Sequence, residues 1–166
     1  MMTIYPPRGE GKLFFPKAQK RALLLTGGTG LGKTFLSASI ARVVSASGHS
    51  VVYDTAGHIF SRFEAQKFGR DDGEADSAVS RALGCDLLIL DDLGTEMITA
   101  YSTSALYTLI NTRLTRKKAT IISTNCSNEE LQKKYTPQIL SRIEGEYQTL
   151  PFVGRDIRQI KKEREA

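Results

Sequence analysis

Two short stretches carry residue types that together suit binding of a nucleoside triphosphate and a metal ion. The first, GGTGLGKT at 27–34, matches the pattern G-x-x-x-x-G-K-[ST]. Its glycines let successive backbone N–H groups turn towards phosphate oxygens, and the following helix points its positive end at them. The pattern predicts a phosphate-binding loop in which Lys33 contacts the β and γ phosphates and the Thr34 hydroxyl binds Mg²⁺. The predicted nucleotide-binding residues are Gly27, Gly28, Thr29, Gly30, Leu31, Gly32, Lys33 and Thr34.

The second stretch, CDLLILDDLGTE at 85–96, runs four aliphatic residues into two adjacent carboxylates, Asp91 and Asp92. Adjacent acids repel each other, and each is costly to desolvate without a partner, so the pair predicts a cation. If this strand is parallel to the one before the loop, both end at the sheet edge where ligands bind. We then expect Asp91 to hold the Mg²⁺ of a nucleotide and Asp92 to polarise the attacking water. The alternative is a pair of solvated acids in a turn.

Strands and helices alternate along the chain, and the strands are apolar on both faces. This pattern predicts one α/β domain with a parallel sheet covered on both sides. The expected strands lie at 21–26, 50–54, 87–92, 119–125 and 147–152. Helices are expected at 35–47, 57–68 and 101–118, with a short helix that ends at Gly84 after the acidic turn 71–76, and helical pieces around 128–142. We assign residues 1–20 to an N-terminal arm or linker, 21–154 to the domain and 155–166 to a basic C-terminal tail.

Composition narrows the class of protein. The chain has 166 residues, enough for one domain with a core, and its 40% hydrophobic and 25% charged residues are typical of a globular protein. No run approaches the roughly 18 apolar residues of a membrane span, and the N-terminus lacks a secretory signal, so we expect a cytoplasmic protein. The net charge of +5 favours acidic partners such as nucleic acid only slightly.

The two cysteines are predicted to be free thiols. Cys85 begins one predicted strand, and Cys126 lies just beyond the end of another. If those strands are parallel neighbours, the thiols lie about 20 Å apart at roughly 3.3 Å per residue. That distance is far beyond the reach of a disulfide.

Further segments distinguish among the classes of phosphate-loop protein. The chain has no NKxD motif of a GTPase, and no convincing lid or arginine cluster of a small-molecule kinase. The segments that carry a resemblance are LLLTGGTGLGKTFL, GHSVVYDTAGHIFSRFE, CDLLILDDLGTE, ALYTLINTRL, IISTNCSNEEL, SRIEG and FVGRDIR. In these the chain resembles the AAA+ ATPases of the bacterial helicase-loader group, the DnaC/DnaI type, with the transposition helper IstB as a near relative. The resemblance runs from about residue 21 to residue 162.

This resemblance implies a P-loop NTPase fold of the AAA+ type, with a five-stranded parallel sheet, helices on both faces and no sizeable C-terminal lid. It implies that Asn125 occupies the sensor-1 position, where a polar side chain helps to place the hydrolytic water. It also implies that Arg142 is an arginine finger acting in trans on a neighbouring subunit, and that Arg158 lies at a place resembling sensor 2. The alternatives are a turn-forming Asn125 and a surface salt bridge for Arg142.

Three departures from the family pattern bear on activity. Most AAA+ proteins have Asp-Glu where this chain has Asp91-Asp92, which loaders of this type also use. The shorter Asp92 reaches less far, so we expect slow hydrolysis in which Glu96 assists. Loaders often carry a second arginine where this chain has Gln138. Only 26 residues precede Gly27, so we expect either an excised ATPase module or a relative that has lost the helicase-binding arm.

DNA contacts are expected from two groups of basic residues, with solvated surface charge as the alternative. They are Arg113, Arg116, Lys117 and Lys118 at a helix end, and Lys161, Lys162 and Arg164 in the tail. Residues 54–85 leave room for two helices, which resembles the extra helix that loaders present to single strands. The aromatic residues Phe60, Phe63 and Phe68 in that region are predicted to pack in the core rather than to stack on bases.

The sequence thus predicts an ATPase that binds ATP or ADP with Mg²⁺ and couples its state to assembly on DNA. Loading of a replicative DNA helicase is the expected task, through a region largely outside this chain. A homo-oligomer that forms on ATP or DNA, and contact with single-stranded DNA but not with a membrane, are expected as well. The alternatives are an IstB-like helper ATPase for transposition and a non-hydrolysing switch that uses ATP only to set partner affinity.

Overall fold

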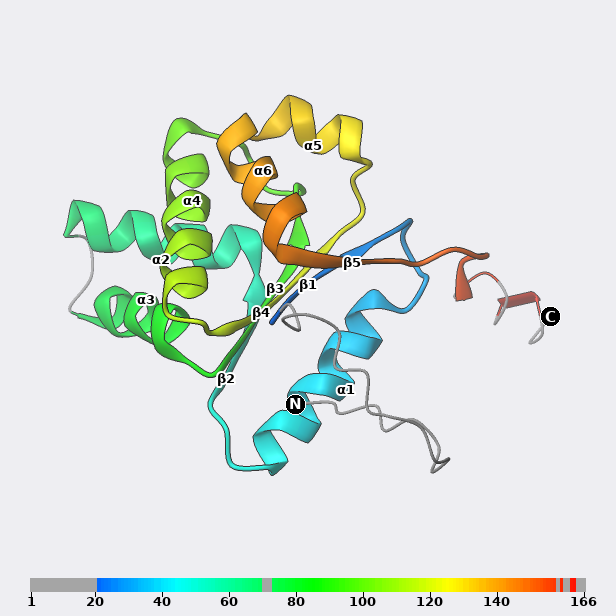
Figure 1. Cartoon of the computed structure of the whole chain (residues 1–166), viewed down its shortest axis with the longest axis horizontal. Coiled ribbons are helices and arrows are strands. Elements are labelled where there is room, and N and C mark those ends of the chain that lie inside the picture. Colours follow the sequence, from blue (N-terminus) through cyan, green and yellow to red (C-terminus); the bar gives the residue numbers. More distant parts are fainter. Residues whose placement is uncertain (1–20, 70–72, 158, 160–161, 164–166) are drawn as a thin grey trace, which may run out of the picture.

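Five parallel strands form the single sheet of the part of the chain that the computed structural model describes, residues 21–69, 73–157, 159, 162 and 163. The strand order is β2-β3-β4-β1-β5, and every pairing is parallel (Figure 1). The strands are β1 (Ala22–Thr26), β2 (Val51–Thr55), β3 (Leu87–Leu93), β4 (Ala119–Thr124) and β5 (Tyr147–Pro151). The prediction of a five-stranded parallel sheet is confirmed. The predicted arm at 1–20 lies outside the described residues.

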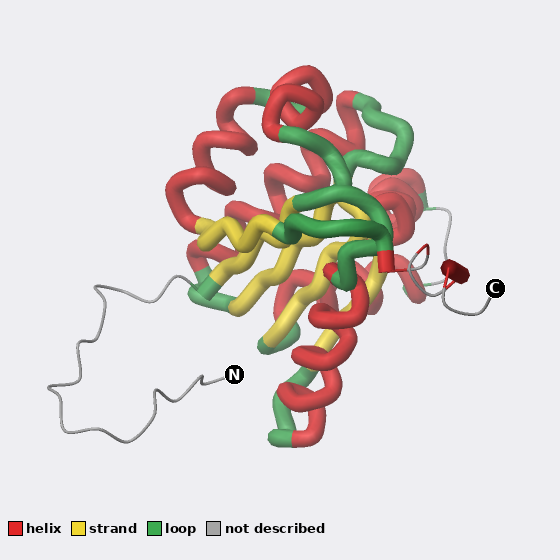
Figure 2. Tube along the Cα trace, turned by 90° about the vertical axis from the view of Figure 1, so that its right-hand side faces the viewer, coloured by secondary structure: helices red, strands yellow, loops and turns green. Residues whose placement is uncertain are grey.

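Helices cover both faces of the sheet, as predicted. One face carries α1, and the other carries the remaining helices, so that the sheet forms the middle layer (Figures 1 and 2). The helices are α1 (Lys33–Ala46), α2 (Ala56–Phe68), α3 (Glu74–Gly84), α4 (Ala100–Thr115), α5 (Asn128–Lys134) and α6 (Pro137–Glu146). None of the helices among the described residues is long and apolar enough to cross a membrane.

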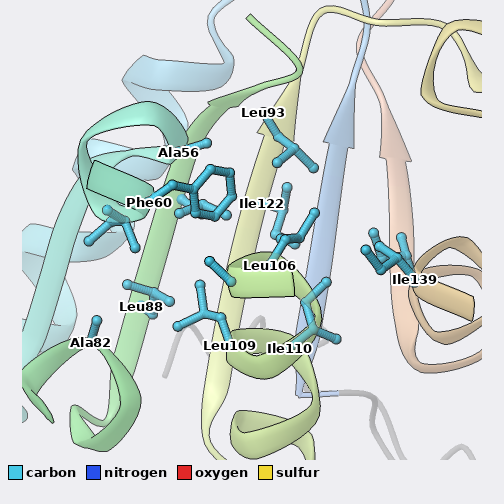
Figure 3. Close-up of a cluster of buried hydrophobic side chains, with 14 of the residues drawn as sticks. Ala56, Phe60, Ala82, Leu88, Leu93, Leu106, Leu109, Ile110, Ile122 and Ile139 are labelled. Carbon is cyan, nitrogen blue, oxygen red and sulfur yellow. The ribbon is translucent and has the colours of Figure 1, made fainter. Parts of the chain in front are cut away.

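Side chains alternate between the two faces of each strand and so divide the core in two. Leu88, Leu90 and Ile122 join the larger cluster, which packs against α2, α4 and α6 (Figure 3). Ile89 and Ile121 join the smaller cluster under α1. This assignment of faces decides which side chains at the strand ends point towards α1 and the loop that precedes it.

The regular alternation of β3 is broken at its end by a β-bulge. Leu90 pairs with Ile122, but the next paired residues are Leu93 and Thr124, so β3 contains one extra residue. That residue is Asp92, whose φ of 56° lies in the left-handed region. Leu93 therefore packs in the larger cluster although regular alternation would turn it towards α1.

The cysteine prediction is confirmed, and the prediction for the aromatic residues holds in part. Cys85 and Cys126 are free thiols at opposite ends of the neighbouring parallel strands β3 and β4. Phe60 and Phe63 are buried in the larger cluster. Phe68 is 54% exposed, so the prediction that it packs in the core is wrong. It is the last residue of α2 before the left-handed Gly69, where the helix extends past the core.

The expectation that Arg113 contacts DNA is wrong, because its side chain is fully buried. Its guanidinium donates hydrogen bonds to four oxygen acceptors and to the Cys85 Sγ at 3.4 Å. The four oxygens are the carbonyl oxygens of Ala82 at 2.7 Å, Cys85 at 3.2 Å and Ala119 at 2.6 Å, and Oγ1 of Thr120 at 2.9 Å. Arg113 thus joins the end of α3 to the starts of β3 and β4. Lys118 of the same basic group donates to Asp86 at 2.9 Å.

Candidate nucleotide-binding site

The predicted phosphate-binding loop connects β1 to α1 at the edge of the sheet where the strands end. Two of its glycines are required by close approach of the segment that follows β5 (Figure 1). A Cβ on Gly27 would overlap the carbonyl oxygen of Phe152, and one on Gly30 would overlap the carboxylate of Asp156. Both glycines also have positive φ, of 132° and 76°, which other residues rarely adopt.

The N-terminus of α1 is arranged to receive an anion. Its N-cap is Gly32, with φ of 95° and no side-chain hydrogen bond to the helix, and the first turn contains no acidic residue. Helices α2, α4 and α5 are instead capped by hydroxyls, whereas α3 also begins at an uncapped glycine but has acidic residues in its first turn. The first N–H groups of α1 therefore lack a capping oxygen of that kind. Such a terminus binds phosphate well, because its free N–H groups and its dipole both favour negative charge.

Lys33, the first residue of α1, lies at the centre of the site. Its ammonium group donates to the carbonyl oxygens of Gly27 at 2.6 Å and Gly28 at 2.7 Å, and to Oδ1 of Asn125 at 2.7 Å. Burial lowers the pKa of Lys33, and the charges of Asp92 and Asp91 oppose that shift. The lysine thus connects the loop to Asn125, which follows β4.

Asn125, just beyond β4, links Lys33 to the second acid. Its Oδ1 accepts from the Lys33 ammonium, and its Nδ2 donates to Oδ1 of Asp92 at 3.2 Å. Since an ammonium only donates and a carboxylate only accepts, these partners fix the orientation of the amide. One side chain therefore spans the distance between the loop and Asp92.

Asp91 is buried on the face of β3 that carries α1, and two hydroxyls donate to it. The Tyr53 hydroxyl donates to Oδ2 at 2.9 Å, and the Ser123 hydroxyl donates to Oδ1. Ser123 Oγ also accepts from the backbone N–H of Asp92 at 3.1 Å. Burial and the hydrogen bond to Asp91 raise the pKa of Tyr53, so its hydroxyl stays protonated and remains a donor.

The oxygen atoms at this edge fit Mg²⁺ bound together with a nucleotide. The Asp91 carboxylate and the Thr34 hydroxyl are hard oxygen donors, and Tyr53 contacts both residues, with its hydroxyl 3.4 Å from the Thr34 carbonyl oxygen. Among the described residues no group of three or more His, Cys, Asp or Glu side chains could hold a metal ion alone. Mg²⁺ commonly needs only one or two carboxylates when phosphates supply further oxygens.

Other candidate residues lie apart from this network or outside the described residues. The Glu96 carboxylate accepts from the backbone N–H of Gly94 at 2.8 Å and from the Tyr135 hydroxyl, so it braces the segment after β3. Arg142 lies on α6 with its guanidinium 5.6 Å from the centre of the Tyr107 ring of α4. Arg158 lies outside the described residues.

Sequence reasoning missed three contributors to the site. Tyr53 and Ser123 gave no signal as isolated residues, although strand alternation would place both on the face of Asp91. The segment after β5 was also missed. The Phe152 N–H donates to the Thr26 carbonyl at 2.7 Å, and the Ile157 N–H donates to the Gly30 carbonyl at 3.0 Å. Residues assigned to the tail therefore contact the loop.

Comparison with known proteins agrees with this geometry. The sequence model described as "IstB-like ATP binding protein" matches residues 13–164, nearly the whole chain. The chain belongs to this family. The prediction of the family, and with it of an ATP-binding domain, is confirmed.

The curated relatives and solved structures that the chain resembles share less than a quarter of its residues in the aligned regions. The replicative helicase loader DnaC of Escherichia coli K12 is 24% identical over 122 residues, which are 74% of this chain and 49% of the loader. The chain spans about half the length of the curated relatives it matches.

A crystal structure of the DnaC helicase loader has a TM-score of 0.69 at 22% identity, covering 80% of this chain and 78% of that one. The replication initiator DnaA, bound to AMPPCP and single-stranded DNA, has a TM-score of 0.70 at 21% identity, covering 86% and 44%. These structures confirm the predicted AAA+ type of P-loop fold.

Proposed function

We propose that this domain binds ATP or ADP with Mg²⁺ and hydrolyses ATP slowly, as the motor domain of a protein that loads a replicative helicase onto DNA. The observation that carries the proposal is the continuous hydrogen-bonded connection from Lys33 through Asn125 to Asp92. It joins the residue that binds phosphate to the residue that acts on water, and both lie at the open edge of the sheet.

In this proposal the loop and Lys33 bind the nucleotide phosphates. The N–H groups of the loop and of the first turn of α1 surround the phosphate oxygens, while Lys33 neutralises part of their charge. An ammonium group has three protons, and Lys33 already donates three hydrogen bonds. Contact with a phosphate oxygen therefore replaces at least one of these bonds.

Thr34 and Asp91 would hold the metal ion. The ion would supply positive charge that offsets the negative charge developing on the phosphates during transfer. Asp91 contributes a carboxylate that Tyr53 and Ser123 hold in place, and Thr34 contributes its hydroxyl from the first turn of α1. The two residues come from β3 and α1, and the Tyr53 hydroxyl contacts both.

Asp92 would orient and polarise the water that attacks the γ-phosphate. Its carboxylate is held by the Asn125 amide, which leaves acceptor positions on both oxygens. An aspartate reaches one methylene less far than a glutamate, which supports slow turnover. A switch that binds ATP without hydrolysing it is the alternative, and the short Asp92 side chain is the feature that favours it.

We further propose that Arg142 completes the site of a neighbouring subunit, with Arg158 as a second cation at the nucleotide. Phosphoryl transfer gains about 10³- to 10⁵-fold in rate from such an arginine. Arg142 is half-buried and packs over Tyr107 of α4, and its helix α6 lies on the face of the sheet opposite α1 (Figure 1). An arginine that acts on a neighbouring subunit must lie away from the nucleotide site of its own chain.

Two relatives support a task in replication. The curated relative is named a replicative helicase loader, and the DnaA neighbour is described as bound to AMPPCP and single-stranded DNA. A transposition helper remains a second candidate, because the matching family model is named for IstB. Co-elution of the longer parent protein with the replicative helicase of its organism, in the presence of ATP, would favour the loader. Co-elution with a transposase instead would favour the helper.

The nucleotide site itself is tested by Lys33→Ala. This variant should bind ATP more weakly by about 2–4 kcal/mol, because a charge-assisted contact to phosphate is lost. Titration calorimetry measures the change. The matched control is Lys134→Ala, which removes another lysine that donates to a backbone carbonyl, that of Gly94. Unchanged ATP affinity in Lys33→Ala would show that the loop is not the binding site.

A further inference from the structure

Three polar side chains end the aliphatic stripe that faces α1, one on each of three neighbouring strands. They are Tyr53 on β2, Asp91 on β3 and Ser123 on β4. Thr55 pairs with Asp91, so Tyr53 lies two residues earlier on the same face of the sheet. A tyrosine is long enough to reach this diagonal neighbour. The polar groups are therefore placed by strand register.

The two hydroxyls fix the Asp91 carboxylate from both sides. Tyr53 donates to Oδ2 at 2.9 Å and Ser123 donates to Oδ1, so each oxygen accepts one hydrogen bond. Bonds from strands on either side of β3 restrict rotation of the carboxylate about its own axis. Each carboxylate oxygen can accept twice, so one acceptor position remains on each for a cation.

The Tyr53 hydroxyl lies between the two residues assigned to the metal. It is 2.9 Å from Asp91 Oδ2 and 3.4 Å from the Thr34 carbonyl oxygen. A phenol has one proton, and the shorter distance indicates that Asp91 receives it. Tyr53 therefore acts on the carboxylate while it contacts the first turn of α1.

We propose that Tyr53 is a positioning residue for the metal ion, whose hydroxyl holds Asp91 in the orientation that receives the Mg²⁺ of bound Mg-ATP. The inference rests on the proposed function, since it needs a nucleotide at the loop. Hydrogen bonds that orient a metal ligand typically change metal affinity by about 10- to 100-fold when they are lost. Tyr53 is the residue to change because it is 36% exposed and Phe keeps its ring. Ser123 is fully buried and also holds the Asp92 backbone.

The experiment measures ATP affinity twice for each variant by titration calorimetry, in excess EDTA and in excess MgCl₂. The Kd in EDTA divided by the Kd in MgCl₂ reports how strongly the protein interacts with the metal of Mg-ATP. This ratio can be measured without turnover. Tyr53→Phe should keep the wild-type Kd in EDTA and lower the ratio by about tenfold. Asp91→Asn should lower the ratio at least as far.

A double-mutant cycle separates positioning from a general structural effect. Tyr53→Phe added to Asp91→Asn should change the ratio no further, because the tyrosine acts only through the carboxylate. The matched control is Tyr107→Phe, which removes the hydroxyl of a tyrosine that is 39% exposed on α4. This control should keep the wild-type ratio.

Each other outcome has a distinct meaning. A wild-type ratio in Tyr53→Phe overturns the inference and leaves the proposed function standing. A further loss in the Asp91→Asn background, or an equal loss in Tyr107→Phe, also overturns it. Wild-type protein that binds ATP in neither buffer refutes the proposed function instead.

Discussion

Substitutions of Asp92 should separate the energetic cost of its backbone conformation from the loss of its chemistry. Asp92 has a φ of 56°, and its side chain accepts a hydrogen bond from Asn125 at 3.2 Å. Asn and Asp tolerate this left-handed region better than other residues with a side chain. Asp92→Asn keeps both the conformation and an acceptor oxygen for the Asn125 amide. It should therefore change the free energy of unfolding by less than about 0.5 kcal/mol.

The same geometry assigns different costs to other replacements. Asp92→Ala loses the hydrogen bond from Asn125, which is worth about 1 kcal/mol. Alanine is also less stable than aspartate in the left-handed conformation, by about 1 kcal/mol. Asp92→Ala should therefore destabilise the domain by about 2 kcal/mol. Asp92→Glu keeps a carboxylate, but glutamate adopts the left-handed conformation less readily than aspartate. The free energy of unfolding should therefore fall by about 1 kcal/mol. Urea unfolding measures these differences as shifts of the midpoint at constant slope.

Turnover should follow a different order from stability. An amide cannot take a proton from water, so Asp92→Asn should lower the rate of phosphate release by about 10²-fold or more while Mg-ATP still binds. Calorimetry and a phosphate-release assay on the same preparation give both values. If Asp92→Asn turns over like the wild type, Asp92 is not the base. If Asp92→Ala is as stable as Asp92→Asn, the left-handed conformation is not what selects the aspartate.

Three further predictions follow from the fold and the proposed function. Arg113→Met should lower the free energy of unfolding by about 3 kcal/mol, because four oxygen acceptors lose their donor although the cost of burying a charge also disappears. Arg116→Met is the exposed control, and equal losses in urea unfolding would contradict the role of Arg113. Ser37→Ala should raise stability by about 1 kcal/mol in the same assay, since the buried Ser37 hydroxyl has no hydrogen-bond partner among the described residues. Finally, a mixture of the inactive variants Lys33→Ala and Arg142→Ala should regain phosphate release, because each supplies what the other lacks. A mixture that stays inactive, although both variants fold and assemble, would rule out action of Arg142 in trans.

The order of strands and helices and their layers could be predicted because local signals agreed with the global fold. Continuous aliphatic runs such as 87–90 and 121–122 indicate strands buried on both faces, and such strands need helices on each side. The phosphate loop could be placed because its glycines and lysine have fixed spacing. These features depend on a single segment each, so one sequence is enough to see them.

Features that depend on two or more segments could not be predicted. Arg113 looked like part of a basic helix end, because nothing in its neighbours shows that α3 and β4 offer it four oxygen acceptors. The bulge at Asp92 depends on the register between β3 and β4. Tyr53 looked like an ordinary strand residue, because only the register between β2 and β3 places it beside Asp91.

The bulge explains how two consecutive carboxylates can serve one site. In a regular strand Asp91 and Asp92 would point to opposite faces, and only one of them could reach the loop. The extra residue leaves Asp91 on the face of α1, while Asp92 contacts Asn125 beyond the end of β4. The Ser123 hydroxyl holds both, since it donates to the Asp91 carboxylate and accepts from the Asp92 backbone.

Phosphate binding is therefore expected to affect Asp92 through contacts that already exist. Lys33 donates three hydrogen bonds, and a phosphate oxygen must replace one of them. If the bond to Asn125 is the one exchanged, its Oδ1 becomes free to accept a proton of water while its Nδ2 still holds Asp92. The residue proposed to place the water would then gain its free acceptor only when a phosphate is present. On this reasoning Asn125→Ala should impair turnover more than ATP affinity, because the phosphate contacts of the loop and of Lys33 remain.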